Sequence, residues 1–407
     1  MIRAGYGLNY DPYPLAFVRN MLTNYPNDLL LTLNPVNNFQ TVTDFKTGIP
    51  TVAVPDISTG RINVPAAYAV RSLADPYERG YVQSWNLSLE KQFLGGFIAS
   101  AAYVGTRQLK ISQTLDLNAG QVLGAGTAGQ PFFSKFGRTV QTAILTPVGR
   151  NQYDALQTRI QRRFTSGIQF SAGYTFSKAL GFCCDELSDS TPAIQIPSYF
   201  YLARSLEPFD RTHNFNLTMV AELPFGRTKE WLKEGWGAAL AGGWSVNALM
   251  TSYSGRPFSV SASDASLNAP GNIQRANQIK PEVAILGNTG PNTSWFDPLA
   301  FAPVTTAAFG TVGYNTLRGP NATNLDLGLF RSFNLTERWK MEFRAEALNF
   351  TNSPHFGLPN GNVSNMQLNA DGTIRSLGGF STITSTVGVG REGVDERVIR
   401  FGLRFSF

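Results

Sequence analysis

The segment that decides the fold lies near the carboxyl end of the chain, where apolar and charged residues alternate without a break. Residues 339–347 read Trp339-Lys340-Met341-Glu342-Phe343-Arg344-Ala345-Glu346-Ala347. A period of two is typical of a β-strand, because successive side chains point to opposite faces. One face of this strand is apolar and the other carries four charges. Such a strand cannot be buried on both sides, so its charged face must adjoin water.

The last segment of the chain, residues 397–407, repeats this alternation. Its apolar side holds Ile399, Phe401, Leu403, Phe405 and Phe407, and its polar side holds Arg400, Gly402, Arg404 and Ser406. We expect the charged residues of both strands, with one aspartate of the strand before them, to line a wet interior: Asp326, Lys340, Glu342, Arg344, Glu346, Arg400 and Arg404. They form either a contact surface for a ligand or plug, or a mutually neutralised, hydrated wall. The alternation of opposite signs favours the wall.

The composition of the chain favours many strands joined by long polar loops. Charged residues make up 15%, against roughly 25% in an ordinary soluble domain, whereas glycine (39), proline (23) and aromatic residues (12%) are plentiful. No apolar run approaches the roughly 20 residues of a membrane-spanning helix, which excludes a helical membrane protein. Membrane-spanning strands remain compatible, because their alternation produces no hydropathy peak.

The net charge of +6 is not concentrated in any basic segment, because lysine and arginine are scattered singly through strands and loops. No nucleic-acid-binding motif is present either, so we expect no nucleic-acid partner. The two cysteines, Cys183 and Cys184, are adjacent, which is neither a disulfide framework nor a metal spacing. They are a pair of loop thiols or a vicinal disulfide.

Strand patterns of about ten residues recur along the chain and are separated by alternately short and long connections. The predicted strands are 2–10, 81–90, 97–106, 153–164, 168–178, 212–223, 244–253, 323–333, 339–350 and 397–407. A locally helical segment is predicted at 228–242. The turn at 165–167 contains Gly167, which supplies the positive φ that a tight hairpin requires. Short turns near residues 95, 166, 225 and 336 fall on one side, and every long loop falls on the other.

This arrangement predicts an all-β, antiparallel transmembrane β-barrel of about ten strands in the outer membrane, with short periplasmic turns and long extracellular loops. The barrel is required because unpaired backbone groups are costly in hydrocarbon, so a spanning sheet must leave no edge. A large soluble sandwich or a propeller is the alternative. Propellers show regular blade repeats, and the sequence contains none.

Several motifs then support a resemblance to a known family. They are Ile2-Arg3-Ala4-Gly5-Tyr6-Gly7, the run from Asn214 to Gly226 with its Leu-Pro-Phe-Gly ending, Gly243-Trp244 followed by Ser254-Gly255-Arg256-Pro257-Phe258, Leu317-Arg318-Gly319-Pro320, Asn324-Leu325-Asp326-Leu327, the run from Phe343 to Asn352, Phe356-Gly357 and the closing run from Phe401 to Phe407. In these motifs the chain resembles the barrels of TonB-dependent receptors. The closest type is the Oar-like group, whose members carry a carboxypeptidase-regulatory-like domain. The resemblance covers residues 1–407 and corresponds to the carboxy-terminal portion of such a receptor.

The resemblance implies a barrel of about 22 strands, of which this chain supplies roughly half. It also implies uptake of a large or scarce ligand, powered by the TonB complex through a plug inside the barrel. The sequence holds no plug, TonB box or signal peptide, so no energy-coupling residue can be assigned. We therefore expect the chain to be part of a longer receptor or the product of a truncated gene. The alternative function, attributed to some Oar-like members, is surface adhesion or organisation without transport.

The resemblance further implies an assembly signal at the end of the chain. Outer-membrane barrels of this type end in an aromatic residue preceded by alternating apolar positions, which the barrel-assembly machinery pairs with as an edge strand. The matching residues are Phe401, Leu403, Phe405 and Phe407. The expected partners are thus outer-membrane lipid, the assembly machinery and an unknown ligand.

Motifs of enzyme chemistry are absent from the sequence, including Gly-x-Ser-x-Gly, His-Glu-x-x-His and Walker loops. Asp210 and His213 lie together at a predicted loop–strand junction, where a rim hydrogen bond is favoured over a catalytic dyad. The acidic residues Asp185, Glu186 and Asp189 match no calcium-loop spacing. We expect no enzyme activity, no catalytic, cofactor-binding or metal-binding residue, and no cofactor.

Overall fold

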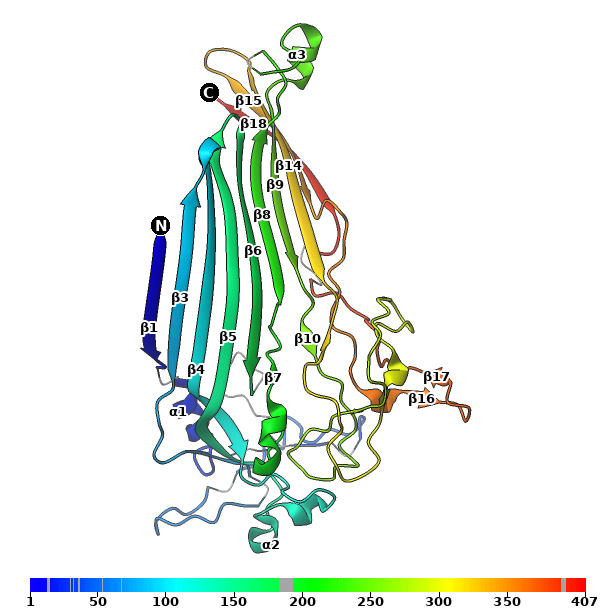
Figure 1. The fold of residues 1–407 in the computed structure, drawn as a ribbon. Coiled ribbons are helices and arrows are strands. Elements are labelled where there is room, and N and C mark those ends of the chain that lie inside the picture. Colours follow the sequence, from blue (N-terminus) through cyan, green and yellow to red (C-terminus); the bar gives the residue numbers. More distant parts are fainter. Residues whose placement is uncertain are drawn as a thin grey trace.

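Long antiparallel strands paired in chain order form the body of the protein in its computed structural model (Figure 1). The structure describes residues 1–407 except 13–14, 30, 32, 36, 53, 67, 183–192, 228 and 389–392. In the described part, the main path of the sheet consists of β1 (Ile2–Tyr10), β3 (Tyr81–Gln92), β4 (Phe97–Asp116), β5 (Thr142–Thr165), β6 (Ile168–Gly181), β8 (His213–Glu222), β9 (Trp244–Tyr253), β14 (Ala322–Asn334), β15 (Lys340–Leu348) and β18 (Val398–Ser406). The predicted all-β, antiparallel class is confirmed.

The short connections and the long loops lie at opposite ends of the sheet, as predicted (Figure 1). We call these the turn-side end and the loop-side end. Both Ser166 and Gly167 have positive φ, 53° and 79°, in the tight turn between β5 and β6. This conformation matches the right-handed twist of the flanking strands, which is why glycine is required there.

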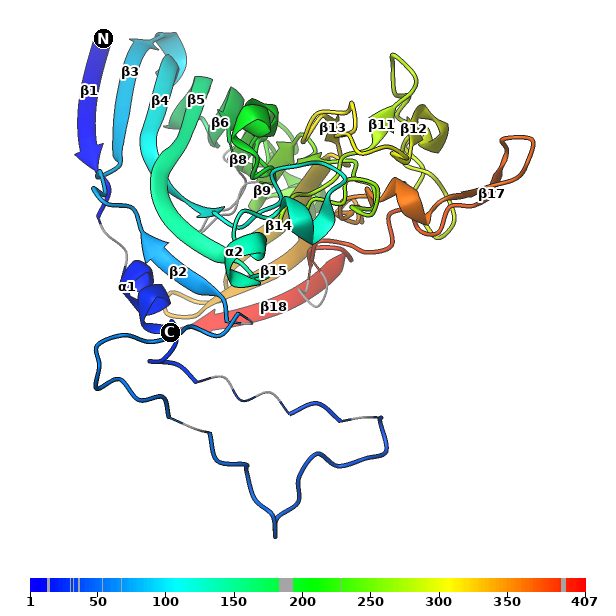
Figure 2. The same ribbon diagram turned by 90° about the horizontal axis from the view of Figure 1, so that it is seen from below.

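The sheet bends into an arc whose edge strands β1 and β18 stand apart (Figure 2). Among the described residues, β1 pairs only with β3 and β18 only with β15. Each edge therefore leaves a row of backbone groups open to a further strand.

Two strands are much longer than the sequence pattern predicts. β4 continues to Asp116 rather than 106, and β5 begins at Thr142 rather than 153. Register shifts between Leu109 and Gln113 interrupt the period of two at this point. Because a bulge moves the following side chains to the other face, alternation alone could not follow the strands beyond it.

Among the described residues, the α-helices are few and short: α1 (Leu15–Leu22), α2 (Phe133–Phe136) and α3 (Gly235–Ala241). The helix predicted at 228–242 is thus limited to α3. Leu232 and Gly235, the first residue of α3, have positive φ of 52° and 69°, so the helix does not extend to earlier residues. No helix in the described part of the chain is long and apolar enough to cross a membrane.

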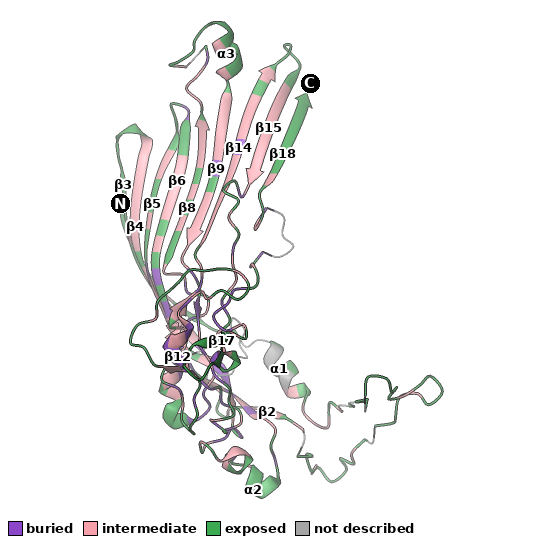
Figure 3. Ribbon diagram, turned by 90° about the vertical axis from the view of Figure 1, so that its right-hand side faces the viewer, coloured by how far each residue is buried: buried purple, intermediate pink, exposed green. Residues whose placement is uncertain are grey.

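The remaining described strands lie at the loop-side end, and each is two to four residues long. They are β2 (Val70–Leu73), β7 (Ser205–Leu206), β10 (Pro257–Phe258), β11 (Asn277–Gln278), β12 (Phe301–Ala302), β13 (Leu317–Arg318), β16 (Gln367–Leu368) and β17 (Ile374–Ser376). Buried residues gather at this end, whereas the long strands are coloured mainly intermediate or exposed (Figure 3). The water-excluding core of the molecule is therefore in its loops and not in its sheet.

Candidate functional site

The charged residues predicted for the interior share one face of the last three strands. Across β15 and β18, Glu342 lies opposite Arg404 and Glu346 lies opposite Arg400. Along β15, Arg344 donates a hydrogen bond from Nε to Glu342. The other face of the same strands carries Met341, Phe343 and their apolar partners. The structure thus brings six of the seven predicted residues together as one polar surface over β15 and β18: Lys340, Glu342, Arg344, Glu346, Arg400 and Arg404.

Asp326, the seventh predicted residue, lies on the adjacent strand β14 and holds the start of a loop. Its Oδ1 accepts hydrogen bonds from Asn324 Nδ2 at 2.9 Å and from the Asn349 backbone N–H at 2.8 Å. Asn349 is fully buried, and its Nδ2 donates to the carbonyl of Ser353 at 3.1 Å. Asn349, which belongs to the family-like run from 343 to 352, therefore ends β15 and orders the loop that follows.

The polar face contains a hollow of about 380 Å³ where β8, β9, β14 and β15 adjoin. Its lining includes Thr218, Asn247, Leu249, Asp326, Phe330 and Glu346. The buried side-chain oxygen of Asn247 has no hydrogen-bond partner in the structure. With the two carboxylates, this oxygen makes the hollow rich in acceptors, which suits a partner that brings hydrogen-bond donors.

The four residues of the predicted assembly signal lie at the opposite, apolar side and are exposed. Phe401 is 74% exposed and Phe407 is 93% exposed, and Leu403 and Phe405 are more than half exposed. Phe401 and Phe405 lie across from Ala345 and Met341 of β15. The apolar row therefore continues from strand to strand and ends at the open edge of β18.

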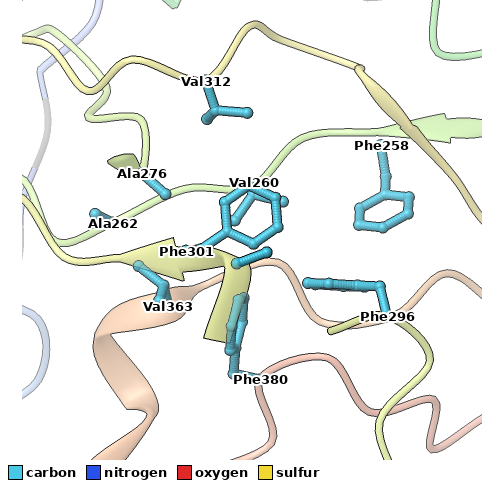
Figure 4. Packing of buried hydrophobic residues seen from close by; sticks show 10 residues of the cluster. Phe258, Val260, Ala262, Ala276, Phe296, Phe301, Val312, Val363 and Phe380 are labelled. Carbon is cyan, nitrogen blue, oxygen red and sulfur yellow. The ribbon is translucent and has the colours of Figure 1, made fainter. Parts of the chain in front are cut away.

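At the loop-side end, two loops form a compact unit that the sequence pattern did not reveal. They are residues 254–321 and 349–388, which we call the cap. Four phenylalanine rings meet at its centre (Figure 4), with centroid distances of 5.3 to 6.4 Å between contacting rings. They are Phe258, Phe296, Phe301 and Phe380. The hydroxyl of Ser381 donates to the Phe296 carbonyl at 2.7 Å, so polar contacts also join the two loops.

Two of the family-like motifs pair with each other at the base of the cap. β10, from the Ser254–Phe258 motif, pairs antiparallel with β13, from the Leu317–Pro320 motif. Gly255 lies so close to Gly319 that an added Cβ would be 1.8 Å from the Gly319 carbonyl oxygen. Glycine is required there because the two backbones approach each other directly. The motifs thus close the 254–321 loop where it leaves the sheet.

A buried ion pair ties this base to the neighbouring loop. Arg318 Nη2 is 2.5 Å from Asp210 Oδ2, and the Asp210 side chain is only 1% exposed. Asp210 also accepts a hydrogen bond from the Ala179 backbone N–H at 2.6 Å. A buried carboxylate needs partners of this kind, because its desolvation is costly. Arg318 belongs to the Leu317–Pro320 motif, but its ionic partner is more than a hundred residues away in sequence.

Asp210 and His213 do not form a dyad. His213 Nδ1 lies 2.8 Å from the hydroxyl of Tyr174, and its ring packs against Tyr174 and Phe176. His355 is buried in the second loop of the cap, far from His213 in sequence. No group of three metal-ligating side chains occurs among the described residues. Cys183 and Cys184, like Asp185, Glu186 and Asp189, lie outside the described residues.

Glu207 is a buried titratable group at the loop-side end that the sequence reasoning missed. Its side chain is almost fully buried, and its backbone N–H donates to the Ala179 carbonyl at 3.0 Å. Burial raises the pKa of this carboxyl to about 7, because the low-dielectric surroundings disfavour its charged form. The residue is therefore sensitive to pH close to neutrality.

The fold and its two-sided strands define a class of outer-membrane β-barrel proteins. The family model described as an outer membrane beta barrel domain matches residues 1–399. The chain belongs to this family, and its location is the outer membrane. No curated protein matches the chain.

Solved structures similar to this chain include two from outer membranes. The outer membrane transporter YddB from Escherichia coli is 9% identical, with a TM-score of 0.39, over 83% of this chain and 33% of that chain. The ferripyoverdine receptor of the outer membrane of Pseudomonas aeruginosa is 11% identical, with a TM-score of 0.37, over 81% of this chain and 28% of that chain. The chain thus spans about a third or less of the length of these proteins.

Proposed function

We propose that this chain is the barrel part of an outer-membrane receptor that takes up a large or scarce ligand. The observation that supports this proposal is that the spanning sheet and the cap adjoin. A sheet with one apolar and one polar face joins, at its loop-side end, a cap with its own phenylalanine core. A preformed cap presents a surface to a ligand without the entropy cost of ordering long loops at binding.

In this proposal, residues 1–407 are the carboxy-terminal part of a longer TonB-dependent receptor. The seven charged residues on the polar faces of β14, β15 and β18 form a hydrated wall of the lumen around a plug, through which the TonB complex supplies energy. The acceptor-rich hollow around Asn247 is the part of that wall best suited to donors from the plug. The Oar-like subtype is supported by the two motifs that close the base of the cap.

The apolar residues of β18 serve as the assembly signal in the same proposal. An exposed apolar row at an open strand edge is what a machine that adds strands to an edge would recognise. The exposure of Phe401, Leu403, Phe405 and Phe407 supports this role.

Transport and adhesion are separated by comparing cells that lack the gene with complemented cells. Solutes remaining in the medium are measured by untargeted mass spectrometry, with and without a protonophore. We expect a solute that disappears only from energised, complemented cultures. If no solute is depleted in this way but cells lose attachment to one another or to a surface, the Oar-like adhesive function replaces transport.

The contact with a plug is tested by photo-cross-linking in cells at two adjacent positions of β15. A photoreactive residue at Arg344, on the polar face, is expected to capture a protein segment. The same residue at Phe343, on the apolar face, is the matched control and is expected to capture lipid. Identical products from both positions would contradict the assignment of the two faces.

A further inference from the structure

A cleft of about 230 Å³ lies on the outward, apolar side of the sheet near its loop-side end. Three arginines from two strands and a loop converge on it. The lining consists of Arg107, Leu109, Arg150, Asn151, Gln152, Leu180 and Arg204. Nothing in the barrel architecture requires so many guanidinium groups at one place.

The strand register gives the position of the cleft relative to the membrane. Arg107 lies opposite Gln152, which in turn lies opposite Leu180. Four residues toward the turn-side end, the same face carries an apolar row of Tyr103, Leu156 and Phe176. Because side chains return to one face every second residue, the cleft and this apolar row belong to the same side of the sheet.

The length of strand β4 places the cleft at a membrane boundary. The aromatic Phe97, over which the Arg162 guanidinium stacks at 5.2 Å, begins the strand at the turn-side end. Roughly 9–11 tilted residues cross the hydrocarbon core, and Arg107 follows Phe97 by about that number. Arg107 itself stacks over Trp85 at 5.1 Å, as expected for a residue at the interface. The cleft therefore lies level with the lipid headgroups of the loop-side leaflet.

The three arginines differ in how their charge is compensated. Arg107 forms a 3.0 Å ion pair with Asp154, whose other oxygen accepts a hydrogen bond from the Tyr103 hydroxyl at 2.7 Å. Among the described residues, the Arg204 guanidinium donates to the neutral amide oxygen of Gln152 at 3.1 Å, and the Arg150 guanidinium stacks over Phe182 at 4.9 Å. Within the described part of the chain, neither Arg150 nor Arg204 has a carboxylate in ion-pair range.

We propose that this cleft binds the phosphate group of a lipid headgroup in the loop-side leaflet. Arg150 and Arg204, which have no carboxylate partner among the described residues, supply the positive charge, and guanidinium groups bind phosphate through paired N–H donors. Leu109 and Leu180 supply apolar contact to the non-phosphate part of the headgroup. A lipid is favoured over a free anion because the cleft is continuous with the lipid-facing surface of the sheet.

The proposal is tested with the chain in nanodiscs of zwitterionic phospholipid. The probe is a bisphosphorylated, acylated disaccharide, and its dephosphorylated form is the chemical control. Retained glycolipid is measured by native mass spectrometry for the parent protein, the double variant Arg150→Gln/Arg204→Gln and Arg162→Gln. Arg162 is the matched control, since it lies on the same strand and face as Arg150 but at the turn-side end.

We expect the phosphorylated probe to bind the double variant at least about tenfold more weakly than the parent, with Arg162→Gln unchanged. Equal retention of the dephosphorylated probe by the parent, or an unchanged affinity in the double variant, would overturn the proposal. It is also overturned if inorganic phosphate displaces the probe at equal concentration, since the site then prefers a free anion. Should the double variant fail to fold, Arg150→Lys/Arg204→Lys keeps the positive charge but removes the paired N–H donors of the guanidinium groups. Its affinity for the phosphorylated probe must then be intermediate.

Discussion

The spanning sheet and the cap are stabilised in different ways, although both belong to one chain. The spanning sheet is a single layer with an apolar face and a polar face. Its apolar side chains, such as Phe401 and Leu403, remain exposed until lipid covers them. The cap buries its phenylalanines against one another. The sheet therefore depends on the membrane and on assembly, whereas the cap carries its own hydrophobic core in water.

The largest effect is expected from a change that prevents assembly of the sheet in the outer membrane. Phe407→Asp, or removal of the last three residues, should lower the amount of heat-modifiable barrel in outer membranes by about tenfold, because the proposed edge signal is lost. The measurement is a gel-mobility assay on isolated outer membranes. Phe39→Asp is the matched control, since Phe39 is equally exposed but lies in a loop. Normal levels for Phe407→Asp would refute the signal.

A second change should loosen the cap and spare the sheet. Phe296→Ala removes the ring that contacts the other three phenylalanines of the core. We expect the cap to lose about 3–5 kcal/mol, the usual cost of such a truncation. Hydrogen exchange should accelerate within 254–321 and 349–388 while the sheet stays protected. Phe45→Ala, at a fully exposed ring, is the control, and parallel loss of protection in both regions would contradict their independence.

A third change tests the tie between the two regions. Arg318→Ala leaves the carboxylate of Asp210 buried without its ionic partner. Breaking such a pair costs about 3–5 kcal/mol, less here because Arg318 is partly exposed. Restoring neutrality with Asp210→Asn in the same molecule should recover part of the loss in urea unfolding. No recovery in the double variant would mean that the ion pair is not the cause.

Glu207 makes the stability of the loop-side end depend on pH. Its pKa in the folded protein is about 7, above the ordinary 4.5, so folding favours the protonated form. The stability contributed by the neutral carboxyl is complete below about pH 4.5 and is lost as pH rises to about 7, by at most about 3 kcal/mol.

The check is the urea midpoint measured from pH 4.5 to 8 for the parent protein and for Glu207→Gln. The variant should remove the fall in stability over this range. Glu337→Gln, at an exposed position of the last turn, should leave the profile unchanged. A parent profile that rises with pH in the same window would show that another group dominates.

The smallest effect is expected on the polar wall of the sheet. Glu342→Gln disrupts the pair with Arg344, and both side chains are about one-third exposed. Exposed pairs contribute about 0–1 kcal/mol, and Arg404 across the strand pair offers partial compensation. The urea midpoint should therefore change little. A loss as large as that of Phe296→Ala would mean that the wall is structural rather than hydrated.

The strands were predictable wherever the period of two was unbroken. The predicted limits of β1 and β9 agree with the structure, and the turn at Gly167 has the expected conformation. The prediction stopped short in β4, because register shifts beyond Leu109 move side chains to the other face. Periodicity reports the face of each residue only while the register is regular.

The candidate site was predictable in part. The charged residues of β15 and β18 could be assigned to one face because their neighbours are local, and the structure brings them together on that face. The pairing of the two glycine-containing motifs could not be predicted, since the loop between residues 255 and 319 shows no periodic pattern of apolar and polar residues. The same applies to the partner of Arg318 and to the arginine cleft, whose members come from three segments.

The sequence by itself determined the two-faced strands, their order and the side on which the turns and loops lie, because alternation and turn residues are local properties of the chain. Only the tertiary structure decided that two long loops share a phenylalanine core, that Asp210 is the partner of Arg318, and that three arginines meet at the outer rim of the sheet. These features depend on contacts between distant residues, and no periodic pattern in a single chain encodes which distant residues meet.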